Sequence, residues 1–83
     1  MIKIFNNKVY NADKTSLFLS GLNIKNIEIS KNDILKSYGT GIHLYDVKTN
    51  PNDPKRTVIR NNLITELSEG YGILIENSSC NVE

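Results

Sequence analysis

The sequence predicts an all-β chain that coils into a solenoid of about three rungs, and three observations lead to this fold class. The 83 residues include eleven Ile, which favours β-strands. They also include twelve Asn, which favours turns and tolerates left-handed backbone. Finally, the Ile and Asn positions recur in a repeat of about 25 residues. Short strands and sharp turns in a regular repeat are typical of a stacked coil.

The first half of each repeat predicts two short strands with a bend between them. In residues 27–34, Ile27 and Ile29 face one side of a strand and Glu28 faces the other, because side chains alternate across a strand. An Asn then interrupts the strand, and an apolar residue begins the second one. The same layout recurs in residues 2–9 and 57–64.

A third strand is predicted nine or ten residues after the Asn of each repeat. The matching segments are 16–19, 41–44 and 72–75. Two of these segments begin with Gly and continue with alternating apolar residues. The last residues, Asn81–Glu83, match Asn26–Glu28 and are expected to begin a fourth unit.

The spacing of the repeats predicts one domain, 1–83, with an inserted surface loop. Equivalent residues are 25 apart between Ile2 and Ile27, but 30 apart between Ile27 and Thr57. The five extra residues fall within 47–56, which holds both prolines of the chain. Because Pro and Asn mark loops, we expect 47–56 to lie on the surface.

A repeat of this length is too short for strand, helix and strand with ordinary loops, but it suits one turn of a coil with three short strands. Stacking the turns pairs each strand in parallel with its equivalent in the next. Asn7, Asn32 and Asn62 then stack at the bend between the first two strands. We expect each of them to take left-handed backbone there, and their amides to bond from rung to rung.

The pattern I-x-I-x-x-N-x-I, a variable loop and then G-I-x-L resembles the repeat of pectate-lyase-like proteins. The resemblance implies their fold, a right-handed parallel β-helix, here with about three rungs. It extends from Ile2 to Val82 and departs in the first unit, where Ser16 stands at the Gly position. The residues that carry it are Ile27, Ile29, Asn32, Ile34, Gly41, Ile42 and Leu44, with Ile59, Asn62, Ile64, Gly72, Ile73 and Ile75.

A small antiparallel sandwich is the alternative fold. Three pairs of alternating strands could form it, with loops such as residues 37–41 serving as hairpin turns. The recurrence of Asn and Gly at matching positions favours the solenoid.

Composition excludes several functional classes. Ten basic and nine acidic residues give no electrostatic basis for binding nucleic acid or an anionic membrane surface. No apolar run approaches the roughly 20 residues of a membrane-spanning helix. The single cysteine, Cys80, excludes an internal disulfide framework and a cysteine-rich zinc site. No cofactor is expected, and the localisation stays open because the first residues lack a signal-peptide pattern.

The two ends of a solenoid indicate which partners it needs. Each end exposes unpaired strand edges and apolar side chains, which natural solenoids cover with a cap. No capping helix is predicted from the sequence. We therefore expect either that the chain is a segment of a longer β-helix or that copies of it associate.

The resemblance implies a ligand groove along the G-I-x-L strand. Its outward residues, with those just beyond, are the candidate substrate-binding residues Phe18, His43, Tyr45, Asp46 and Glu76. His43 and Asp46 are the only candidate acid–base pair, and His43 could equally be a solvent-facing residue of an amphipathic strand. Two carboxylates, Asp46 and Glu76, are too few for a calcium site, so no metal is predicted.

The resemblance thus implies a carbohydrate-associated β-helix segment, from a polysaccharide-acting enzyme or from a spike or adhesin. Its partner would be a polysaccharide, and we expect no complete catalytic site within the chain. The alternative is a small non-enzymatic protein that self-associates.

Overall fold

The computed structural model describes residues 2–21, 26–48 and 57–83, and every regular element among them is a β-strand. The strands are β1 (Ile2–Phe5), β2 (Lys8–Tyr10), β3 (Leu17–Ser20), β4 (Ile27–Ser30), β5 (Asp33–Leu35), β6 (Ile42–Tyr45), β7 (Val58–Arg60), β8 (Leu63–Thr65), β9 (Ile73–Glu76) and β10 (Asn81–Val82). Within the described ranges, no helix has the length and apolarity needed to span a bilayer.

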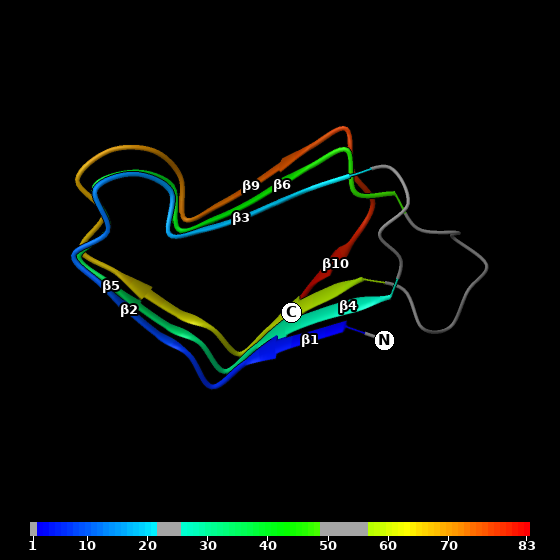
Figure 1. The fold of residues 1–83 in the computed structure, drawn as a ribbon, viewed down its shortest axis with the longest axis horizontal. Helices are drawn as coiled ribbons and strands as arrows, with labels where there is room; N and C mark the ends of the chain where they lie inside the picture. The colour runs from blue at the N-terminus through cyan, green and yellow to red at the C-terminus, as the bar shows by residue number, and fades with distance from the viewer. Residues whose placement is uncertain (1, 22–25, 49–56) are drawn as a thin grey trace.

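The strands form three parallel sheets. Sheet A has the order β1-β4-β7-β10, sheet B has β2-β5-β8 and sheet C has β3-β6-β9. Figure 1 shows the successive rungs lying over one another along the same three-sided path. The molecule is therefore a small parallel β-helix of about three rungs, which is the predicted fold class. The antiparallel sandwich is wrong, because every pair of strands within residues 2–21, 26–48 and 57–83 is parallel.

The register within the sheets confirms the alignment of the three repeats. Ile29 pairs with Ile59 in sheet A, and Ile34 with Ile64 in sheet B. In sheet C, Leu17, Ile42 and Ile73 are aligned, which places Ser16 and Gly72 beside Gly41 as expected.

The register of the last strand differs from the expected one. The sequence match aligned Val82 with Ile27, but β10 pairs Val82 with Ile59, which is the position of Ile29. The shift is two residues. Because strand side chains alternate with period 2, such a shift keeps the same residues facing inward, and the apolar pattern cannot detect it.

The core lies inside the coil and is centred on the second rung. Ile27, Ile29, Ile34, Ile42 and Leu44 are almost completely buried there, and Ile59 joins them from the third rung. Apart from Ile59, which β10 covers, their equivalents in the first and third rungs are partly buried or exposed, because each has a stacked rung on one side alone. The second rung is thus the only one with a complete apolar interior within the described residues.

The bends between strands are made by left-handed residues that stack in register. Asn6, Lys31 and Asn61 have φ of 58°, 54° and 56° between the first two strands of each rung. The expectation that Asn7, Asn32 and Asn62 take this conformation is wrong, because the residue just before each of them does. The Asn residues serve the bend through their side chains instead.

The stacked Asn side chains form the predicted ladder. The Oδ1 of Asn32 accepts bonds from the backbone N–H of Asn7 at 3.1 Å and from its Nδ2 at 3.0 Å. The Oδ1 of Asn62 accepts the same two bonds from Asn32, at 3.0 and 2.9 Å. The ladder therefore has a direction, in which each rung donates to the following one.

Only part of the predicted loop 47–56 falls within the described residues. Val47 is completely buried, and its N–H donates to the Oγ of Ser78 at 2.9 Å. Lys48 is exposed. Residues 49–56 lie outside the described part of the chain.

Candidate functional site

The candidate residues lie along the outward face of sheet C and at its end. The register aligns Phe18, His43 and Leu74 in one row across the sheet, and Ser20, Tyr45 and Glu76 in the next. Because these rows alternate with the inward Leu44 and its equivalents, all their side chains leave the coil on the same side. The sheet thus gathers residues from three rungs.

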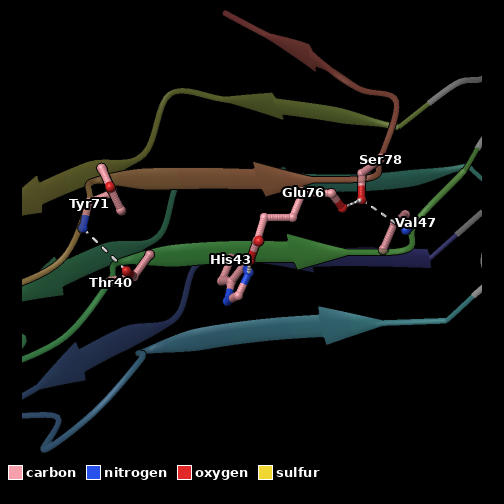
Figure 2. A network of polar contacts seen from close by, with 6 residues as sticks. All are labelled: Thr40, His43, Val47, Tyr71, Glu76 and Ser78. Carbon is pink, nitrogen blue, oxygen red and sulfur yellow. Dashed lines mark hydrogen bonds and ion pairs between the residues drawn. The ribbon is translucent and has the colours of Figure 1, made fainter.

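His43 and Glu76 form the central polar contact of this face. The Nε2 of His43 lies 2.7 Å from the Oε1 of Glu76, and Figure 2 shows the side chain of Glu76 reaching from β9 across to His43 on β6. The side chain of His43 is 16% exposed and that of Glu76 is 49% exposed. In the structure the contact of His43 is therefore with Glu76, whereas the sequence had suggested a pair with Asp46.

Phe18 extends this face onto the first rung. Its ring meets the imidazole of His43 edge-on, with centroids 4.8 Å apart and planes at 85°. This T-shaped arrangement is a favoured one for aromatic pairs. Phe18 nevertheless stays 53% exposed, so its ring presents apolar surface to solvent.

Asp46 is held at the end of the sheet and takes a different partner. Asn77 donates a hydrogen bond from Nδ2 to the Oδ1 of Asp46, and both residues have left-handed backbone. The two carboxylates of the site, Asp46 and Glu76, are thus engaged separately. Tyr45, beside them, is 43% exposed. Across the described ranges, no three His, Cys, Asp or Glu side chains gather in a way that could hold a metal ion.

Side-chain hydroxyls add hydrogen bonds between the two chain segments at both ends of β6 and β9, as Figure 2 shows. At one end, the N–H of Tyr71 donates to the Oγ1 of Thr40 at 3.2 Å. At the other, the Oγ of Ser78 accepts from Val47 and donates to the carbonyl of Glu76 at 2.8 Å. The strands that carry His43 and Glu76 are therefore anchored on both sides of the pair.

A polar groove of about 500 Å³ lies on another part of the surface, where sheet B passes into the loops before sheet C. Its walls are Asn11, Ala12, Asp13, Lys36, Tyr38, Glu66 and Ser68. Sequence analysis missed this groove because the residues that stack there, Asn11, Lys36 and Glu66, share no residue type. Their shared signal is left-handed backbone, which a sequence does not display.

Lys36 is the cation of this groove. Its Nζ lies 5.5 Å from the centroid of the Tyr10 ring. A hydrogen bond to Tyr10, together with the negative charge of the phenolate form and of Glu66, raises the pKa of Lys36. Lys36 therefore stays charged and cannot act as a base near neutral pH.

Cys80 does not supply a reactive thiolate. The residue is partly buried next to the core, and this burial raises the pKa of the thiol above its ordinary value of 9.0. A thiol is a weak nucleophile until it ionises.

Comparison with protein-family models, with curated proteins and with solved structures found no match for the chain. Sheet C presents the candidate site. It offers exposed aromatic rings beside an imidazole–carboxylate pair, an arrangement suited to binding a ligand with both apolar faces and hydroxyl groups.

Proposed function

We propose that the chain is a carbohydrate-binding β-helix segment whose ligand lies along the outward face of sheet C. The observation that carries the proposal is the exposed ring of Phe18 directly beside the His43–Glu76 pair. A sugar ring has apolar C–H faces that pack on aromatic rings, while its hydroxyls bond to carboxylates and imidazoles. Phe18 and Tyr45 supply the first kind of contact, and Glu76 with His43 supplies the second.

The resemblance of the repeat to that of pectate-lyase-like proteins supports the same location. The resemblance implies a ligand along the strand G-I-x-L, which is β6 in the second rung and β9 in the third. The proposal accordingly extends to a polysaccharide ligand, with uronate polymers as the first class to examine.

In this proposal the chain binds a polysaccharide and does not turn it over by itself. A hydrolase of the carboxylate-pair type needs two carboxyl groups flanking one bond. Here Glu76 is occupied by His43 and Asp46 by Asn77, which supports a binding role.

The test measures binding of oligogalacturonides, and of a neutral glucan oligosaccharide for comparison, by isothermal titration calorimetry. We expect Phe18→Ala to raise the dissociation constant about fivefold, since stacking on one ring contributes on the order of 1 kcal/mol. Glu76→Gln should also weaken binding. The matched control is Tyr10→Ala, which removes a ring of similar exposure (60%) from sheet B.

Equal losses in Phe18→Ala and Tyr10→Ala would contradict a site on sheet C. Absence of binding to both oligosaccharides by the unaltered chain would contradict the carbohydrate class itself.

A further inference from the structure

The polar groove between sheets B and C is built from all three rungs. Backbone hydrogen bonds hold its loops in register. The N–H of Tyr38 donates to the carbonyl of Ala12 at 2.8 Å, and the N–H of Ser68 donates to the carbonyl of Ser37 at 3.0 Å. The walls are therefore two columns with one residue from each rung: Asn11, Lys36 and Glu66 in one, and Asp13, Tyr38 and Ser68 in the other.

The groove opens at the side of the coil, because all six residues of these columns are exposed. Figure 1 shows the three loops between sheets B and C following the same outward curve. A further turn of the coil at either end would add one residue to each column and would leave the groove open. The volume of about 500 Å³ lies within the range of ligand sites in proteins.

The charges of the groove are unbalanced at one wall. The ammonium group of Lys36 is compensated by the carboxylate of Glu66, whose negative charge contributes to raising the pKa of the lysine. No hydrogen bond or ion pair joins the carboxylate of Asp13 to another residue in the described ranges. Lys14 and Glu69, on the same loops, have opposite charges and lie outside the walls. The groove therefore has one negative charge in excess, at Asp13.

The neighbour of Asp13 in its column is Tyr38, which is 55% exposed. A carboxylate attracts a cation, and the face of an aromatic ring attracts one as well. A guanidinium group suits both partners, because it is planar, stacks on aromatic rings and forms paired hydrogen bonds with a carboxylate. The side-chain oxygens of Ser68 and Asn11 offer acceptors for its remaining N–H groups.

We propose that this groove binds a guanidinium group, with Asp13 as its carboxylate partner and Tyr38 as its stacking surface. The source of the group is either an arginine side chain of a peptide or a small guanidinium compound. None of the residues that line the groove belongs to β3, β6 or β9. The site is thus separate from the outward face of sheet C and does not depend on the carbohydrate ligand proposed there.

The test follows the backbone amide resonances of the isotope-labelled chain by NMR during titration with acetyl-arginine amide. We expect the amides of Asp13 and Tyr38 to shift and to saturate in the millimolar range, while those of sheet C stay unchanged. Acetyl-citrulline amide, which has the same shape without the charge, should cause no comparable shifts. A short peptide with a central arginine identifies the source. Tighter binding of the peptide assigns a protein segment, and equal binding assigns a small compound.

Substitutions in the two columns should act in opposite directions. Asp13→Asn should raise the dissociation constant of acetyl-arginine amide about fivefold, and Tyr38→Leu about threefold, as expected for exposed ion pairs and cation–π contacts. Lys36→Gln should lower the dissociation constant, because the charge of Glu66 is then no longer compensated. The matched control, Asp33→Asn, removes a carboxylate of sheet B outside the groove and should leave binding unchanged.

The Lys36→Gln variant separates a cation site from an anion site, since an anion site requires the lysine. Weaker binding of acetyl-arginine amide to Lys36→Gln, or equal losses in Asp13→Asn and Asp33→Asn, would overturn the proposal. Equal binding of the arginine and citrulline amides, or the absence of shifts in the groove, would overturn it as well. Urea unfolding of the groove variants should match that of the unaltered chain, because the substituted side chains are exposed.

Discussion

At the scale of single residues, Asn32 holds the most demanding position in the structure. It is 2% exposed, donates to the carbonyl of Ile4 and to Asn62, and accepts from Asn7. A buried amide with all its bonds made stabilises the fold, whereas its loss leaves several buried groups without partners. The stacked amide therefore closes the bend through its side chain, and the preceding Lys31 provides the turn in the backbone.

We predict that Asn32→Ala lowers the free energy of unfolding by about 2–3 kcal/mol, because its partners in two rungs lose their bonds together. Asn7→Ala should cost only about 1 kcal/mol, since Asn7 is exposed at the end of the ladder and water replaces its bonds. Urea denaturation of both variants measures the difference. Equal losses at the two positions would contradict a cooperative ladder.

The residues of the candidate site were predicted, but their pairing was not. Period-2 alternation was enough to place Phe18 and His43 on the outward face of one sheet. The partner of His43 depends on which rung lies beside it. It also depends on the register between the second and third repeats, which are separated by 30 residues and not by 25. Glu76 is 33 residues away in sequence and lies on the neighbouring strand, where it is the partner of Tyr45 and therefore diagonal to His43. That diagonal contact follows from side-chain direction, which no sequence pattern displays.

At the scale of elements, the strands and their parallel order follow from the repeat, because apolar residues at alternate positions specify which face of each strand is buried. The bends are less visible in the sequence. Lys31, Lys36 and Glu66 take left-handed backbone although their side chains do not favour it. Stacking against neighbouring rungs imposes this conformation on them, and local propensity alone would not have placed it there.

The close approach of rungs at Gly41 gives an element-scale prediction. Gly41→Ala should destabilise the fold by about 1–3 kcal/mol, because the new Cβ would overlap the Gly72 carbonyl and the side chain of Ile64, 2.9 Å away. Gly72→Ala, at the same position one rung later, should change stability by less than about 0.5 kcal/mol in the monomer. Thermal unfolding monitored by circular dichroism compares the two. A large loss in Gly72→Ala would show that this glycine is needed within the single chain.

At the scale of the whole molecule, stability depends on the second rung. An 83-residue chain has on the order of 4–12 kcal/mol of stability, and here most fully buried apolar side chains belong to one turn of the coil. The outer rungs act mainly as covers for the middle one. Shortening by one rung would thus remove the one complete layer of the core that the described residues form.

Matched substitutions at two aligned positions of sheet A test whether stability depends mainly on the second rung. Ile29→Val should cost about 0.5–1.5 kcal/mol, because Ile29 is completely buried. Ile4→Val, at the aligned position of the first rung, should cost at most about half as much, since Ile4 is only partly buried. Urea unfolding should be measured at concentrations where the chain is monomeric, and similar costs at both sites would contradict a core centred on the second rung.

The stacking of equivalent bends has a consequence for how such a chain can change in evolution. Asn6 and Lys31 have nearly the same backbone angle and stand 25 residues apart, each followed by an Asn of the ladder. A duplication of these 25 residues in the coding sequence would add one turn of the coil. The added turn would begin and end at bends of the same geometry, so no new kind of bend would be needed. Coil length can therefore vary between descendants by whole turns, while every inherited turn keeps its shape.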